Sequence, residues 1–167
     1  MDSALNTFND AFGELFNESN PDYILKHAAP ILSEFHSDID LKLVYHAAVP
    51  DADYKAIENN HVHVQLKYAG QTIDKPHLFL NEARLSAIAI SIYLGMIKRH
   101  PHLIDYKLLF LDDIFIGLDI GNRLPLLDIL KSQFNDYQII ITTYDRPWYE
   151  YAKSHLEKGY PRNTIGN

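Results

Sequence analysis

Residues 108–145 decide the fold, and they read LLFLDDIFIGLDIGNRLPLLDILKSQFNDYQIIITTYD. Two short apolar runs, 108–111 and 139–141, enclose a segment, 121–135, whose apolar side chains recur at helical spacing. A strand, a helix and a second strand in this order form a parallel pair, and strands that are apolar throughout are covered on both faces. The stretch therefore predicts an α/β fold with a mostly parallel sheet and flanking helices.

A helical pair is expected at the start of the chain. Apolar residues recur at helical spacing over about 3–18 and again over 24–35. Asn20 followed by Pro21 has the form of an N-cap with proline at the first helical position. Pro30 lies inside the second pattern, so we expect it to kink or split that helix.

Between the helical pair and the parallel unit, the sequence predicts a small β element and one long helix. Apolar and polar residues alternate over 41–46 and, more regularly, over 61–67. A nearly all-round apolar helix follows over 81–100. We therefore divide the chain into a helical lead-in or arm base, 1–40, and a main lobe, 41–167.

Composition places the chain among globular proteins. It has 167 residues, of which 47% are hydrophobic and 22% charged, and it contains no cysteine, which fits a reducing cytoplasm. No apolar run is long enough to span a membrane and no secretory signal is visible. Residues 1–60 carry 11 acidic against 3 Lys or Arg side chains, whereas 61–167 carry 11 against 12. Any contact with DNA must then be local, or lie elsewhere in a larger assembly.

Polar residues follow both apolar strands at their carboxyl ends, where open α/β sheets bind ligands. Asp112 and Asp113 follow the first strand, and Thr-Thr-Tyr-Asp at 142–145 follows the second. Four apolar residues followed by two acids form the Walker B pattern. Its first acid holds Mg²⁺ through water, and the second orients the attacking water. The plainer interpretation is that the two acids only end a strand near solvent.

Three neighbouring segments accompany these acids. Residues 113–119 end in Gly-Leu-Asp, 139–145 are three isoleucines followed by Thr-Thr-Tyr-Asp, and 78–90 read LFLNEARLSAIAI. They resemble the D-loop, the H-loop strand and the signature motif with its helix in ABC-type ATPase heads of the SMC, RecF and RecN kind, within the P-loop NTPase superfamily. Their order and spacing match that family over residues 76–148.

The resemblance implies a lobe that binds ATP with Mg²⁺ and shares each nucleotide with a second head. The expected catalytic, nucleotide-contacting and metal-holding residues are Asp113 and Tyr144, then Asn81, Glu82, Arg84 and Asp119, and finally Asp112. Within this set, Asp119 would lie at the dimer interface and Tyr144 would replace the switch histidine. Asn81 and Glu82 would serve the signature role toward ATP on the opposite head.

Several positions depart from the family pattern. Phe79 stands at the signature serine, Leu80 and Asn81 stand at the glycine pair, Asp113 replaces a glutamate and Tyr144 replaces a histidine. These changes predict slow or altered turnover. Asn81 has a plainer interpretation too, as the cap of the helix that begins at Glu82.

The largest departure is an absence: none of the seven glycines opens a Walker A pattern, G-x-x-x-x-G-K-[ST]. The resemblance then implies half of a head, as an excised piece, a truncated reading frame or one subunit of a split ATPase. We expect it to be inactive as an isolated chain and to need a Walker A lobe or a second head, in DNA repair, DNA maintenance or phage defence. The alternative is a non-catalytic regulatory or scaffold module that binds a partner ATPase.

Other interpretations stay open. His61 and His63 have the spacing of some metal sites, although their alternation with valines favours a solvent-facing position. Asp112, Asp113 and Asp119 could instead form the centre of a metal-dependent nuclease or phosphatase.

The aromatic segment 146–151, RPWYEY, could stack on bases or, as we favour, dock a terminal helix on the sheet. Arg84 and Arg123 could face phosphate, a partner head or plain solvent.

Overall fold

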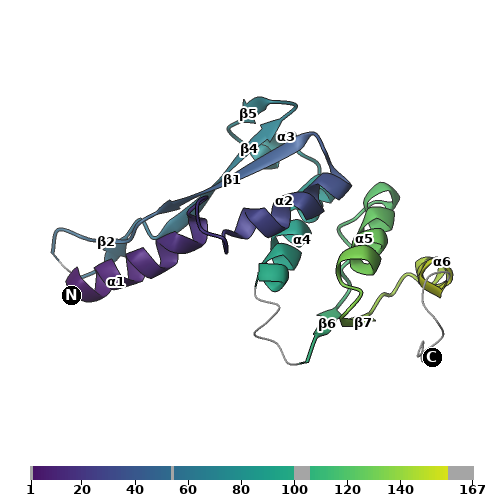
Figure 1. Cartoon of the computed structure of the whole chain (residues 1–167). Coiled ribbons are helices and arrows are strands. Elements are labelled where there is room, and N and C mark those ends of the chain that lie inside the picture. The colour runs from purple at the N-terminus through teal and green to yellow at the C-terminus, as the bar shows by residue number, and fades with distance from the viewer. Residues whose placement is uncertain (1, 54, 100–105, 158–167) are drawn as a thin grey trace.

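The computed structural model describes residues 2–53, 55–99 and 106–157 (Figure 1). The first half contains α1 (Asp2–Gly13), the 3₁₀ turn η1 (Glu14–Phe16), α2 (Ile24–Phe35), β1 (Ile39–His46), β2 (Val49–Pro50), β3 (Ile57–Glu58), β4 (His61–Tyr68) and β5 (Gln71–Ile73). The second half contains α3 (Pro76–Phe79), α4 (Glu82–Arg99), β6 (Leu108–Leu111), α5 (Ile120–Gln133), β7 (Gln138–Ile141) and α6 (Arg146–Glu157). The chain is thus a mixed α/β protein, as the sequence predicts.

β6 and β7 form the expected parallel pair, in register from Leu108 with Gln138 to Leu111 with Ile141. α5 connects the two strands, so the unit is a β-α-β crossover. The amide of Thr142 also donates to the carbonyl of Leu111, at 3.0 Å, which extends the ladder past the last paired residues.

Only one face of this pair is covered, in contrast to the expectation of strands buried on both faces. Leu109 and Leu111 are buried in the main apolar cluster with α5. Leu108, Phe110 and Ile140 point the other way, and Phe110 is 55% exposed. Apart from Gln138 the strands are apolar, but no described segment of the chain packs on their second face.

The larger sheet is antiparallel, with strand order β1-β4-β5. β1 and β4 pair from Ile39 with Tyr68 to His46 with His61, which confirms both strands expected there. Ala69 and Gly70, with φ of 49° and 80°, turn the chain from β4 into β5. Within the described residues, parallel pairing is therefore limited to β6 and β7, and the expectation of a mostly parallel sheet is not confirmed.

α2 and α4 form the layer between the two sheets (Figure 1). They approach closely at Gly95, where an added Cβ would lie 2.7 Å from the backbone of Ala28. One side of the layer packs on the antiparallel sheet through Leu32, Ile39, Leu66, Leu80 and Ile88. The other side packs on the parallel unit through Ile31, Ile90, Leu94, Leu109 and Leu111. The larger antiparallel sheet and the parallel pair therefore share one pair of helices, and β2 and β3 form a separate antiparallel pair.

One local prediction about α2 is wrong, and of the two outcomes expected at Pro30, a kink or a split, the split is not observed. The helix begins at Ile24 after Tyr23, because the side chain of Asn20 accepts from the amide of Asp22 at 2.9 Å and forms a turn rather than a cap. Pro30 does not split the helix, which runs unbroken to Phe35. Pro30 lies on the exposed side, where its missing amide costs least.

α1 with η1 confirms the first expected helix and is fixed to the end of β1. Asn9 exchanges two hydrogen bonds with the backbone of Ala48, at 2.8 and 2.9 Å, and accepts a third from the Tyr45 hydroxyl at 2.8 Å. Among the helices described, none is long and apolar enough to cross a membrane.

Candidate functional site

The acids after β6 and the threonine after β7 meet at the same edge of the parallel pair. Thr142 donates its hydroxyl to Asp112 in a short hydrogen bond and accepts the amide of Asp113 at 3.1 Å. One side chain thus orients the first acid and fixes the backbone of the second. Sequence reasoning missed this role of Thr142. The parallel register could have shown it, because Leu111 pairs with Ile141 and the next residues face each other.

Asp113 has a left-handed backbone, with φ of 49°. A non-glycine residue in this region costs about 1–3 kcal/mol and occurs preferentially where a side chain must be aimed. The chain then turns at once, because the amide of Ile116 donates to the carbonyl of Asp113 at 3.1 Å. Asp113 is half-buried whereas Asp112 is exposed, so the two acids point into different surroundings.

The segment from Asp113 to Asp119, here called the D-loop segment, packs on α4. At Gly117 an added Cβ would lie 2.5 Å from the Ser86 hydroxyl and 3.3 Å from its Cβ, so a larger residue would require the Ser86 side chain to move. Asp119 accepts the amide of Asn122 at 3.0 Å and caps α5. The observed role of Asp119 is therefore structural, although its side chain remains exposed.

Asn81 is the cap of α4, because its side chain accepts the amide of Arg84 at 3.0 Å. Glu82 begins the helix and is exposed. Arg84 is engaged within the chain: its guanidinium lies 3.7 Å from the Asp38 carboxylate and 4.9 Å from the centroid of the Tyr68 ring. These contacts leave Asn81 and Glu82, but not Arg84, directed to solvent at the start of α4.

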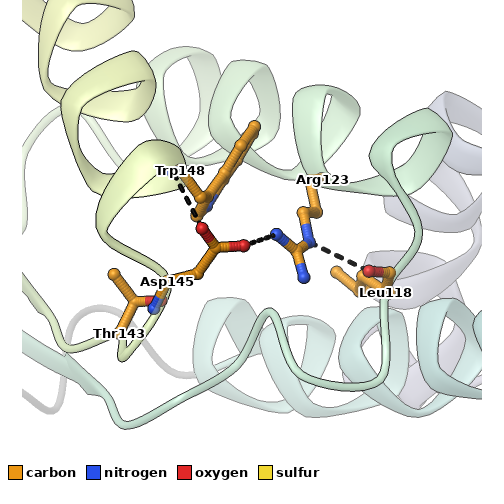
Figure 2. Close-up of polar contacts among 5 residues, drawn as sticks. All are labelled: Leu118, Arg123, Thr143, Asp145 and Trp148. Carbon is orange, nitrogen blue, oxygen red and sulfur yellow. Dashed lines mark hydrogen bonds and ion pairs between the residues drawn. The ribbon is translucent and has the colours of Figure 1, made fainter.

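The loop after β7, residues 142–145, here called the β7-end loop, presents Tyr144 almost fully to solvent, at 91% exposure. The next residue is held firmly (Figure 2): the Asp145 carboxylate accepts from Arg123 at 2.8 Å and from the amide of Trp148 at 3.0 Å. The Arg123 guanidinium holds the pKa of the Asp145 carboxyl below its ordinary value, and the Trp148 amide adds to the effect. Arg123 is therefore engaged within the chain, and its side chain is 18% exposed.

The aromatic segment at the start of α6 docks on the core, as favoured from the sequence. Trp148 is buried, and its ring meets that of Phe115 edge-on with centroids 5.2 Å apart. Tyr151 stacks on the outer side of Trp148 and stays exposed.

No described residues form a cluster of three or more histidine, aspartate or glutamate side chains that could hold a metal. The rings of His46, His61 and His63 contact one another on the exposed face of the antiparallel sheet, without converging on one point. Asp112 nevertheless fits Mg²⁺, since this ion keeps most of its waters in nucleotide sites and needs only one or two protein carboxylates. The three-aspartate centre of a nuclease is not supported, because Asp119 is engaged in capping α5.

Two hollows lie away from these acids. One, of about 500 Å³, opens between the start of α2 and the edge of β1 and β4, lined by Tyr23, Lys26, Lys42 and Lys67 among others. The other, of about 530 Å³, lies between η1 and β1. Neither hollow is lined by Asp112 or Asp113.

No family model matches the chain, and no curated protein matches it significantly. Solved structures do. A chain from work on ATP-driven dimerization and DNA-stimulated activation of SMC ATPases is 16% identical, with a TM-score of 0.54, over 85% of this chain and 74% of that one. An Smc head bound to the C-terminal winged-helix domain of ScpA is 18% identical, with a TM-score of 0.54, over 73% of this chain and 34% of that one.

A third similar structure is an Smc head with an extended coiled coil, bound to the C-terminal domain of ScpA, from Pyrococcus furiosus. It is 17% identical, with a TM-score of 0.52, over 77% of this chain and 29% of that one. This chain thus spans about a third of the length of the second and third structures. At such identities the likeness concerns the fold alone. Over most of its length, the chain shares its fold with part of an SMC ATPase head.

Proposed function

We propose that this chain is the C-terminal lobe of an SMC-like ATPase head and binds Mg-ATP together with a lobe that carries a Walker A loop. The observation that carries the proposal is the joined edge of β6 and β7, where Thr142 links Asp112 and Asp113. This arrangement occurs in a fold shared with SMC heads, at the positions where the sequence resembles Walker B and the H-loop strand.

The proposed roles follow the geometry of each side chain. Asp112, exposed and oriented by Thr142, holds Mg²⁺ through water. Asp113, aimed by its left-handed backbone, orients the attacking water. Tyr144 contacts phosphate or water where the family has a histidine, and Asp119 lies at the interface between heads.

Asn81 and Glu82 present the amino-terminal end of α4, whose dipole favours a phosphate, to ATP on the opposite head. We leave Arg84 out of the proposed contacts, because Asp38 and Tyr68 already engage it.

The open face of the parallel pair supports a missing lobe. Parallel sheets normally have both faces covered, yet here Leu108, Phe110 and Ile140 are exposed. A lobe that adds strands beside β6 and β7 and helices over this face would cover these side chains and bring its phosphate-binding loop to Asp112. The Smc heads bound to ScpA have much longer chains, consistent with further segments in a complete head.

Exposed apolar residues in two segments support contact with another head. Leu78, Ile116 and Ile120 are each more than 70% exposed, and Phe79, next to Leu78 in sequence, is 54% exposed. These apolar residues flank the signature-like and D-loop segments, where the family joins two heads. Like the similar SMC ATPases studied for ATP-driven dimerization, the complete head would dimerise. The setting we propose is cytoplasmic DNA repair, DNA maintenance or phage defence.

Metal binding and hydrolysis test the proposal separately. Mn²⁺ added to the chain should broaden the amide resonances of residues 112–113 and 142–144, and Asp112→Asn should abolish the effect. Mg-ATP should not be hydrolysed by the chain alone. Robust turnover that is lost in Asp113→Ala would show that the phosphates are held within this chain, and the half-head assignment would then be wrong.

The second candidate is a scaffold that binds a partner ATPase without contributing chemistry. Phe79 in place of the signature serine and the solvent-directed Tyr144 favour it. In a complex with the partner, Asp112→Asn separates the two functions: a scaffold tolerates the change, whereas a catalytic lobe loses turnover.

A further inference from the structure

Arg123 joins two segments to which the proposed function gives different roles: the D-loop segment carries Asp119 at the interface between heads, and the β7-end loop carries Tyr144 toward phosphate or water. Its Nε donates to the carbonyl of Leu118, at 2.9 Å, one residue before Asp119. Another guanidinium nitrogen donates to Asp145 at 2.8 Å, one residue after Tyr144 (Figure 2). The guanidinium is planar and its donors are fixed relative to one another, so neither contact can shift without moving the other.

The Asp145 carboxylate extends this link into the β7-end loop and α6. Its second oxygen accepts the amide of Trp148 at 3.0 Å, while the amide of Asp145 donates to the Thr143 hydroxyl at 3.2 Å. Both Thr143 and Asp145 belong to the loop that carries Tyr144. The loop is therefore positioned by the same carboxylate that holds Arg123.

Trp148 provides a parallel, apolar connection. The Arg123 guanidinium lies 5.4 Å from the centroid of its ring, and the ring of Phe115, in the D-loop segment, meets its edge at 5.2 Å. Trp148 is buried, so it cannot move away from Phe115 without opening the core. The polar and apolar connections thus join the same two segments.

We propose that Arg123 is a positioning residue that couples the D-loop segment to the β7-end loop, so that Asp119 and Tyr144 move as one unit. The meaning of this coupling for ATP rests on the proposed function, but the coupling itself does not. Arg123 touches no reacting group. It acts by holding Asp119, the proposed head-interface residue, in a fixed position relative to Tyr144, the proposed replacement of the switch histidine.

The test uses the full 167-residue chain and two substitutions of Asp145, one of which removes the ion pair with Arg123 and the other the cap of α6. Asp145→Asn keeps a side-chain acceptor for the Trp148 amide but removes the charge that holds Arg123. Asp145→Glu keeps the charge but caps α6 poorly. Amide hydrogen exchange is followed at Ile116 and Leu118, whose amides bond within the D-loop segment.

Asp145→Asn should speed exchange at Ile116 and Leu118 by about tenfold, whereas Asp145→Glu should leave it within about twofold of the native rate. Arg123→Lys should act like the Asn variant and also shift the emission of Trp148, the single tryptophan. The opposite order of the Asn and Glu variants would show that α6 capping alone matters, and would overturn the proposal. So would changes confined to residues 143–149.

Asp136→Asn is the matched control. It breaks the ion pair with Lys107 at the opposite end of the same strands, so exchange at Ile116 and Leu118 should not change. An equal acceleration there would indicate general loosening and would also overturn the coupling. None of these measurements needs nucleotide or metal. Coupling found together with a failure of Mn²⁺ to bind at Asp112 would retain the inference and reject the ATPase assignment.

Discussion

The larger antiparallel sheet and the parallel pair differ in the polarity of the outer face that each exposes to water. The outer face of β1 and β4 is exposed and mostly polar, with Asp40, Lys42, His46, His61, His63, Gln65 and Lys67. The outer face of β6 and β7 is exposed and apolar, with Leu108, Phe110 and Ile140. Both sheets pack their inner faces on α2 and α4. The outer face of the first sheet is suited to contact with water, whereas the apolar outer face of the second is the one that the proposed function covers with a further lobe.

The largest expected effect is a difference in stability between alanine substitutions at two neighbouring residues of β6. Leu109→Ala should lower the free energy of unfolding by about 2–5 kcal/mol, because it leaves a cavity in the main apolar cluster. Phe110→Ala should change it by less than about 0.5 kcal/mol in the isolated chain, because its ring is largely in water. Urea denaturation measures both.

The same contrast in β4 is the control: Leu66→Ala should be costly, whereas Gln65→Ala should be nearly neutral. Under the proposed function, the two sheets differ once the missing lobe is added: Phe110→Ala should then weaken association with that lobe, and Gln65→Ala should not. A large loss for Phe110→Ala in the isolated chain would mean that its face is already covered, and the comparison would fail.

Gly95→Ala tests whether the two sheets depend on one helical joint. The added Cβ would meet the Ala28 backbone at 2.7 Å, so α2 must move away from α4, at a cost of about 1–3 kcal/mol. Both sheets should then unfold at lower denaturant, seen by circular dichroism and by Trp148 fluorescence in one shared transition.

Gly121→Ala is the matched substitution. It lies in the first turn of α5, where an added Cβ meets only the Asp119 carboxylate at 3.4 Å. It should be neutral or stabilising by up to about 1 kcal/mol. Two separate transitions in Gly95→Ala, one for each sheet, would contradict a shared joint.

Thr142→Val tests whether the Thr142 hydroxyl organises Asp112 and Asp113 at the carboxyl edge of the parallel pair. The variant keeps the shape of the side chain but removes the donor to Asp112 and the acceptor for the Asp113 amide, at an expected cost of about 1–2 kcal/mol. Mn²⁺ broadening at residue 112 should weaken as well. Thr142→Ser should retain both properties; if Val behaves like Ser, the hydroxyl does not organise the acids.

Much of this arrangement was readable from the sequence, for physical reasons. Period-two alternation marked β1 and β4, and two apolar runs around a helical pattern marked the parallel pair. Once the strands are parallel, Asp112 and Thr142 must share an edge. The sequence could not predict whether this chain covers the second face of β6 and β7, because a continuous apolar run is the same whether that face contacts the same chain or another one.

The ion pair of Arg123 and Asp145 was also beyond sequence reasoning. The two residues are 22 positions apart, and their contact depends on how α5 and α6 pack around Trp148. Surface arginines usually face solvent, so nothing in the local pattern distinguished this one. Asn81 illustrates the opposite case: a cap-forming residue before a helix predicted its hydrogen bond to the backbone directly.

The smallest expected effect is a dependence of the free energy of unfolding on pH, caused by His36 at the end of α2. His36 ends α2, close to Arg84, Asp38, Asp119 and Asn122. Burial, and then the charge of Arg84, hold the pKa of His36 below its ordinary value of 6.5. The unfolded chain therefore takes up this proton at a higher pH than the folded chain does.

Stability from this group is complete above pH 6.5 and should fall as the pH drops from there to the lowered folded pKa, with no further loss below it. Urea midpoints at several pH values between 7.5 and 5 measure the slope, which His36→Gln should reduce. His63→Gln, on the exposed outer face of the antiparallel sheet, is the matched control. An unchanged slope in His36→Gln would place the acid sensitivity elsewhere. If Trp148 fluorescence shows the same reduced slope, the titration of His36 affects the parallel pair as well as the antiparallel sheet.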